Sequence, residues 1–320
     1  KQLNQVMIRR LKSDLVDADG NLLYAQRKLE ALPILYTAKE REIHSKLNDY
    51  CKSRELGAEK TGSTFGTAFV NQLLKKRLFS SPAAFASTLE KHIASLTYGN
   101  LRSDNSPMDD RILRKAILRV DEDYANDQEV ENAQSEAVEE ASCRAQPLTT
   151  DQQQMLSELR KWAQIARNQV DSKAKAVLSW LDTNLKTNGH WNEHRVILFT
   201  EYRTTLQWIH EILASHGFGG ERLAILHGGI AQDEREKVKA AFQTAPKDSA
   251  VRILLATDAA SEGIDLQNHC NCLIHLEIPY NPNVMEQRNG RIDRHGQRQK
   301  EVLLWHPVDG DENSQASIGG

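Results

Sequence analysis

The feature that most constrains the fold is a series of five short apolar runs from residue 195 onward. Each run has four to six residues, and helix-length amphipathic segments separate the runs. The runs are 196–199, 223–226, 251–256, 272–276 and 302–305. Continuous apolar strands that alternate with helices are typical of a parallel sheet covered on both faces. The sequence therefore predicts an α/β domain, with helices at 203–216, 231–243 and 283–294.

The chain before this region has helical periodicity instead. Thr37 and Glu40 have the spacing of a capping box before an amphipathic helix. A second helical stretch follows near 68–78, and Ser81-Pro82 is a typical start for a third. Helical periodicity returns from 150 to 186. We therefore expect a helical insertion at 36–170, an α/β domain with helices on both faces at 171–308, and a flexible tail at 309–320.

An acidic segment interrupts the helical insertion. Nine acidic residues and no Lys or Arg occur between Val120 and Ala141. Such a run is usually a solvated helix face or a disordered loop, and we expect an acidic loop over 120–141. The alternative is a segment that imitates nucleic acid and gates a basic groove.

Composition excludes some classes of protein. A formal net charge of −3 over 320 residues gives no whole-chain sign of nucleic-acid binding, so any such surface depends on local basic residues. No apolar stretch has the length of a membrane span, and the chain opens at Lys1, which favours an internal piece of a longer, cytoplasmic protein. The four cysteines form no C-x-x-C pair. Cys270 and Cys272 lack a second pair of ligands, so no metal site is predicted.

Polar and small residues follow the predicted strands, where ligands bind in sheets of this type. Thr200 and Thr257 each directly follow a run and have hydroxyls that can donate to phosphates. His227-Gly228-Gly229 permits close approach of a backbone, and Ser261-Glu262-Gly263 offers free amides. Each feature also has an ordinary structural interpretation, because threonine is common in strands and glycine in tight turns.

The last segment, 286–297, is the most specific. Asn281 can cap its helix, with Pro282 at the first helical position. At about 100° per residue, Gln287, Arg291 and Arg294 fall at about 0°, 40° and −20°, which is one stripe. Two guanidinium groups on one face favour an anion such as a polyphosphate. The alternative is that these arginines pair with carboxylates such as Glu262 or Glu286.

Taken in order, these segments resemble motifs IV, IVa, V and VI of superfamily 2 helicases. More narrowly, they resemble the SWI2/SNF2 family and its bacterial RapA/HepA-like ATPases. Residues 8–14, 171–173 and 281–282 are similar to further stretches of that family. The resemblance covers 1–50 and 171–308, and it implies that 1–35 is an inter-lobe linker segment. Tyr280 and His295 depart from the residues that many relatives have, a tryptophan and an isoleucine.

The resemblance implies the C-terminal RecA-like lobe of an ATP-dependent DNA translocase. The implied arginine fingers are Arg291 and Arg294, the implied nucleotide-binding residues are Gln287, Gly263 and Asp265, and the implied DNA contacts are Thr200, Gly228, Thr257 and Ser261. No G-x-x-x-x-G-K-[ST] occurs, since 57–61 has Glu59 where glycine is required. ATP with Mg²⁺ is therefore expected mainly on an N-terminal lobe upstream, and this chain alone is expected to be inactive.

The expected partners are double-stranded DNA and that N-terminal lobe. The helical insertion could also touch DNA or a protein through Lys75, Lys76 and Arg77. The alternative function is a non-catalytic nucleic-acid-binding or regulatory module that keeps the same fold.

Overall fold

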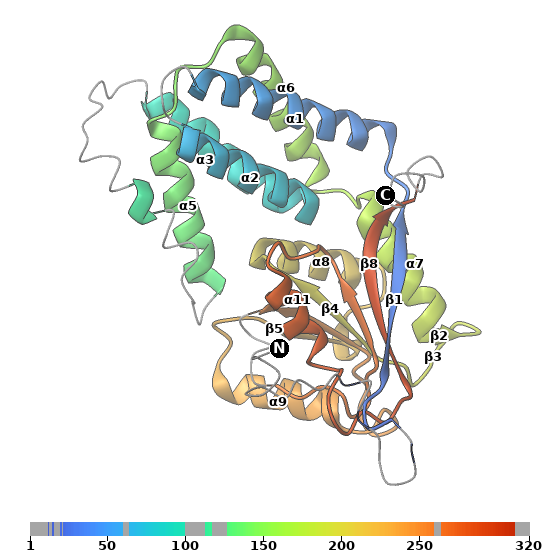
Figure 1. Ribbon diagram of the computed structural model, residues 1–320. Coiled ribbons are helices and arrows are strands. Elements are labelled where there is room, and N and C mark those ends of the chain that lie inside the picture. The colour runs from blue at the N-terminus through green and yellow to red at the C-terminus, as the bar shows by residue number, and fades with distance from the viewer. Residues whose placement is uncertain are drawn as a thin grey trace, which may run out of the picture.

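The computed structural model describes residues 12, 15, 20, 22–59, 64–99, 113–116, 127–258 and 264–310. Helices gather at one end of the molecule, and a sheet flanked by further helices lies at the other (Figure 1). The strands are β1 (Gln26–Ile34), β2 (Lys186–Thr187), β3 (His190–Trp191), β4 (Val196–Thr200), β5 (Leu223–Leu226), β6 (Ile253–Thr257), β7 (Cys272–His275) and β8 (Glu301–Asp309). The helices are α1 (Ala38–Glu59), α2 (Thr64–Ser80), α3 (Pro82–Gly99), α5 (Asp127–Cys143), α6 (Thr150–Ala166), α7 (Ser172–Leu185), α8 (Arg203–Ser215), the 3₁₀ turn η3 (Gly220–Arg222), α9 (Gln232–Gln243) and α11 (Pro282–Asn289).

The main sheet has six strands in the order β1-β8-β7-β4-β6-β5, and every neighbouring pair is parallel. Side chains of successive strand residues point to opposite faces. Val196 and Leu198 of β4 join a core with α7 and α8, whereas Ile197 and Phe199 join a second core that includes Phe242 of α9. Both faces are thus apolar and covered by helices, which confirms the predicted α/β class.

Strand β1 lies within the segment that was predicted to be a linker. Its nine residues pair in parallel with β8, from Gln26 opposite Glu301 to Ile34 opposite Asp309 (Figure 1). The segment predicted to be a linker, 1–35, therefore contains a strand of the main sheet at 26–34. Pro33 is compatible with a strand here because β1 is at the edge of the sheet, where one side of the backbone needs no partner. The end of β8 at Asp309 also extends the sheet slightly beyond the predicted domain boundary.

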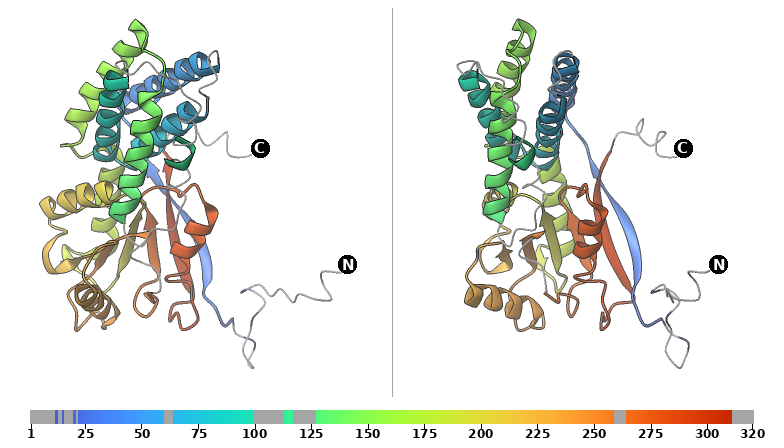
Figure 2. Two further views of the ribbon diagram at one scale, coloured as in Figure 1. Left: turned by 90° about the vertical axis from the view of Figure 1, so that its left-hand side faces the viewer. Right: turned by 60° about the vertical axis from the view of Figure 1, so that its left-hand side comes forward.

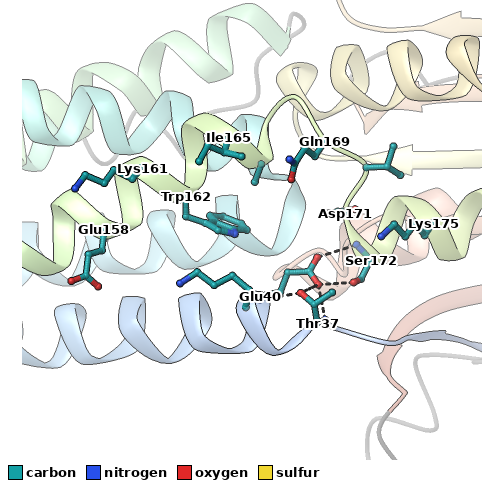
Figure 3. A pocket seen from close by; sticks show the side chains of 13 residues that line it. Thr37, Glu40, Glu158, Lys161, Trp162, Ile165, Gln169, Asp171, Ser172 and Lys175 are labelled. Carbon is teal, nitrogen blue, oxygen red and sulfur yellow. Dashed lines mark hydrogen bonds between the residues drawn. The ribbon is translucent and has the colours of Figure 1, made fainter.

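The helical part has its own core, formed by apolar residues of α1, α2, α3, α5 and α6. The predicted capping box is confirmed, since the backbone N–H of Thr37 donates to Glu40 at 2.7 Å and that of Glu40 donates to Thr37 Oγ1 at 3.2 Å. Glu40 also accepts from the backbone N–H of Ser172 at 2.9 Å, which joins the starts of α1 and α7 (Figure 3). A cavity of about 590 Å³ lies beside this junction, between α1 and α6. No helix among the described residues is both long and apolar enough to cross a membrane.

The acidic segment forms a helix where a loop was expected. Residues 127–141 lie in α5, and 120–126 lie outside the described residues. Ala137, Val138 and Ala141 are buried on one side of α5, and the helix packs on α2 and α3. The apolar stripe provides the packing that stabilises a helix rich in acidic residues. Two views show α5 running from the helical part to the sheet (Figures 1 and 2).

Candidate nucleotide and nucleic-acid interface

The C-terminal ends of β4, β5 and β6 bring three predicted site residues to one edge of the sheet. Thr200 and Thr257 are the last residues of β4 and β6 and lie opposite each other in the register. Gly228 follows β5, which pairs with β6. The parallel topology therefore collects residues that are far apart in the sequence. Ser261 and Gly263 lie outside the described residues.

Both threonine hydroxyls are buried and have carboxylate partners. Thr257 Oγ1 donates to Asp127 of α5 at 2.5 Å, and the backbone N–H of Gly228 donates to the same carboxylate oxygen at 2.6 Å. Thr200 Oγ1 donates to Glu277 at 3.2 Å. Burial raises the pKa of Asp127, although the hydrogen bonds from Thr257 and Gly228 oppose this effect. The donors at this edge thus bind carboxylate oxygens, as they would bind the oxygens of a phosphate.

The helix of the last motif is shorter than predicted. Helix α11 ends at Asn289 instead of 294, although Asn281 caps it through Asn283 N–H and Pro282 begins it as expected. Beyond Gly290, the backbone N–H of Arg291 donates to Arg288, three residues earlier, and Ile292 does the same to Asn289. Bonds of this 3₁₀ type turn by about 120° per residue. The single stripe calculated at about 100° per residue is therefore wrong past residue 289.

As a result, the two proposed arginine fingers have different surroundings. Arg291 is 7% exposed, and its carbonyl accepts from the backbone N–H of Leu266 at 3.1 Å. Arg294 is half-exposed and pairs with Asp265, while its Nε donates to the carbonyl of Gly290 at 2.7 Å. Gln287 is exposed. The structure thus pairs Arg294 with the carboxylate of Asp265. Sequence reasoning did not predict this partner.

Basic side chains within and before β1 pair with carboxylates of the last motif. Arg27 Nη1 donates to both oxygens of Glu286 at 2.9 and 2.8 Å, and its Nε pairs with Asp293. Partial burial lowers the pKa of Arg27, but Glu286 and Asp293 together raise it by more, so the pKa is raised overall. Lys12 also donates to Asp293, at 2.9 Å. Glu286, one of the carboxylates considered for the fingers, therefore pairs with Arg27.

A buried ionic group beneath the interface was missed by sequence reasoning. Arg288 binds the two oxygens of Asp258 at 2.5 and 2.7 Å and lies 3.7 Å from Glu277. Burial lowers the pKa of Arg288, but Asp258 and Glu277 raise it by a larger amount. The pKa is therefore raised overall, and the guanidinium stays charged. Burial raises the pKa of Glu277, while Arg288 and Lys173 oppose the rise. The only feature of the sequence that pointed to this ionic group was the position of Arg288 within the last motif.

The helical part is attached to the same edge through polar contacts. Ser80, at the end of α2, lies 2.6 Å from Thr205 of α8 through their hydroxyls and donates to Glu277 at 3.3 Å. Lys173 donates to the carbonyl of Phe79 at 2.7 Å. Arg77 is buried against Tyr202 and Gln134, so it does not face solvent as a nucleic-acid contact would. Among the described residues, no three His, Cys, Asp or Glu are grouped as metal ligands.

Comparison with known proteins agrees with this arrangement. Residues 176–296 match the family described as the helicase conserved C-terminal domain. The uncharacterized ATP-dependent helicase YqhH of Bacillus subtilis is 35% identical over 139 residues, which are 43% of this chain and 22% of that protein. The RNA polymerase-associated protein RapA of Proteus mirabilis is 33% identical over 120 residues, which are 38% of this chain and 12% of that protein. The matched region thus spans less than a quarter of either relative.

The helicase domain of Pyrococcus furiosus Hef has a similar fold. Its TM-score is 0.51 at 13% identity, over 92% of this chain and 57% of that one. The parallel sheet and the order of motifs along its edge define a RecA-like helicase C-terminal domain. Together with the matches to YqhH and RapA, they show that residues 176–296 form a helicase conserved C-terminal domain similar to that of SNF2-type ATP-dependent helicases.

Proposed function

We propose that this chain is the C-terminal motor lobe of an ATP-dependent DNA translocase. Two sets of donors support this proposal, one at the C-terminal ends of β5 and β6 and the other in the turn after α11. Gly228 N–H and Thr257 Oγ1 converge on a single anionic oxygen, and the turn that contains Arg291 and Arg294 lies beside Asp265. The first set suits a phosphate of the nucleic-acid backbone, and the second suits a nucleotide.

In this proposal ATP and Mg²⁺ are held mainly by an N-terminal RecA-like lobe. ATP use is supported by the printed name of YqhH, which describes that relative as an ATP-dependent helicase. Arg291 and Arg294 stabilise the charge that develops on the transferring phosphoryl group, and Gln287, Gly263 and Asp265 line the nucleotide side. Arg294 first exchanges Asp265 for phosphate. Because that ion pair is half-exposed, it is weak enough to exchange.

Thr200, Gly228, Thr257 and Ser261 are proposed to contact the phosphate backbone of duplex DNA. Backbone contacts position a protein without reading sequence, as a motor moving along any DNA requires. The helical part is a further candidate surface for a protein partner, and the printed name of RapA associates that relative with RNA polymerase.

The test uses a protein that also contains the N-terminal lobe. Arg291→Ala and Arg294→Ala are each expected to lower DNA-stimulated ATP hydrolysis by about 10³-fold or more. Equilibrium binding of a fluorescent ATP analogue should persist, because the other lobe holds most of the nucleotide. Arg291→Lys keeps the positive charge at the buried position and therefore serves as a control for misfolding caused by loss of that charge.

Arg298→Ala is the control, since Arg298 is exposed and lies outside the motif. Its hydrolysis should match that of the unaltered protein. Undiminished hydrolysis in both Arg291→Ala and Arg294→Ala would contradict the proposed finger roles.

A further inference from the structure

The N-terminal end of α5 occupies the surface where nucleic acid is proposed to bind. Asp127, the first residue of α5, accepts from Gly228 N–H at 2.6 Å and from Thr257 Oγ1 at 2.5 Å. Asp127 is only 4% exposed, so its carboxylate fills the space in front of these donors. A phosphate oxygen cannot reach the same two donors while Asp127 is in place.

A second carboxylate of α5 binds the same edge one helical turn further on. Glu131 accepts from the backbone N–H of Thr204 at 3.1 Å and from its hydroxyl at 3.0 Å, in the first turn of α8. Arg77 holds Glu131 from the other side at 3.4 Å. Anions are favoured at the N-terminus of a helix, where backbone amides point outward. Asp127 and Glu131, on one face of α5, therefore occupy two positions where an anion would be favoured.

The chemistry of α5 is that of an anionic ligand. Residues 127–143 include six acidic side chains and no Lys or Arg. Carboxylate and phosphodiester oxygens accept charge-assisted hydrogen bonds from the same donors. We infer that α5 is an intramolecular substitute for the phosphate backbone, and that its first turns must leave before Gly228 and Thr257 can contact a nucleic-acid strand. This inference rests on the proposed DNA contacts and adds their regulation.

The packing of α5 allows one end to detach while the other stays fixed. Towards its C-terminus, Ala137, Val138, Ala141 and Ser142 are buried against the helical part. In the first two turns the buried side chains are Asp127, Ala133 and Gln134, two of which are polar. Loss of contact at this end therefore exposes little apolar surface. Burial also raises the pKa of Asp127, which indicates that desolvation opposes the docked carboxylate.

The test measures binding of a fluorescein-labelled DNA duplex to the chain by anisotropy at constant salt. Asp127→Asn removes the charge that competes with phosphate, and Glu131→Gln does so at the second position. Each is expected to tighten binding by about tenfold, since roughly that factor corresponds to one charge-assisted contact. Glu129→Gln is the matched control, because Glu129 is exposed on the same helix and carries the same charge. It should change binding less than about twofold, the effect of net charge alone.

Thr257→Val, made alone and with Asp127→Asn, separates the inference from the proposed contact. If the inference and the proposed contact are both right, the double variant does not show the tighter DNA binding that Asp127→Asn produces alone. If Asp127→Asn and Glu131→Gln behave like Glu129→Gln while Thr257→Val weakens binding, the contact stands and the inference is overturned. If Thr257→Val changes nothing in either background, the DNA contact itself fails, and the inference with it.

Amide hydrogen exchange provides a second readout that needs no substitution. Adding duplex DNA to the unaltered chain is expected to speed exchange in the first turns of α5 and to leave its last turns protected. Unchanged or slower exchange in the first turns, with DNA bound, would overturn the inference.

Discussion

At the scale of residues, two arginines of one motif show how burial decides what a charge does. The Arg288 side chain is 1% exposed and binds Asp258, whereas that of Arg294 is 39% exposed and pairs with Asp265. Taking an arginine from water is costly, so the buried one must keep its carboxylate partners. The half-exposed pair is screened by solvent and can exchange partners. We therefore expect Arg288 to stabilise the fold and Arg294 to be able to exchange Asp265 for an anionic ligand.

This contrast predicts different losses of stability. Arg288→Leu leaves Asp258 and Glu277 without their buried cation and should lower the free energy of unfolding by about 3–5 kcal/mol. Arg294→Ala should cost less than about 1 kcal/mol. Urea unfolding of the two variants beside the unaltered chain measures both. Equal losses would show that Arg288 is not the structural member of the pair.

At the scale of elements, β1 changes the role of the segment before the helical part. It covers the full length of β8 and brings Arg27 to Glu286, which precedes the proposed fingers, and to Asp293, which lies between them. The segment predicted to link two lobes thus also closes one edge of the sheet and holds the last motif. A connection of this kind would couple any movement of an N-terminal lobe directly to Arg291 and Arg294.

Removing β1 should therefore damage the sheet itself. A chain beginning at Thr37 loses the burial of Leu32 and Ile34, which contributes about 3–6 kcal/mol. It also leaves β8 as an open edge of nine residues, which favours aggregation. Size-exclusion chromatography and urea unfolding are the measurements, and a chain beginning at Leu22, which keeps β1, is the control. Two equally stable monomers would contradict the structural role of β1.

At the scale of the whole molecule, the helical part and the sheet each bury a neutral histidine. His92 lies between Tyr50 and Ser142 in the helical part, and burial lowers its pKa to about 3. His275 of β7 bonds to Asn289, and burial, with Arg288 next, lowers its pKa to about 3. An unfolded histidine has a pKa of about 6.5. The contribution of each to stability is fully present above that value and is lost as pH falls towards about 3.

Acid should therefore destabilise both parts. Between pH 7.5 and pH 5 each histidine should remove about 2 kcal/mol of stability, and His92→Gln or His275→Gln should each abolish that share. Buried Glu277 and Asp127, whose pKa is raised, act in the opposite direction at lower pH, so variants are compared with the parent at each pH.

Calorimetry shows whether the two parts unfold together. The contact of Ser80 with Glu277 and that of Lys173 with Phe79 join the two parts and predict one transition, in which His92→Gln and His275→Gln have the same effect. His194→Gln, at an exposed position, controls for the loss of a histidine. Two transitions, each sensitive to only one variant, would show that the parts are independent.

Local and periodic features could be predicted from the sequence alone. The apolar runs determined a two-faced parallel sheet because only buried strands tolerate continuous apolar residues. The capping box at Thr37 and the helix start at Pro82 were predictable because their hydrogen bonds span three or four residues. The order of motifs predicted the helicase lobe, since each motif follows its own strand. How each site residue acts remains a prediction.

Contacts between distant residues were decided only by the tertiary structure. β1 pairs with residues 301–309, and no local pattern in 26–34 specifies that partner. The acidic run reads as solvated because its composition is polar, yet Asp127 is buried when β5 and β6 place Gly228 and Thr257 beside it. The pairing of Arg294 with Asp265 likewise depends on the turn after Gly290. Burial and partner choice come from the packing of whole elements, and a single sequence does not specify them.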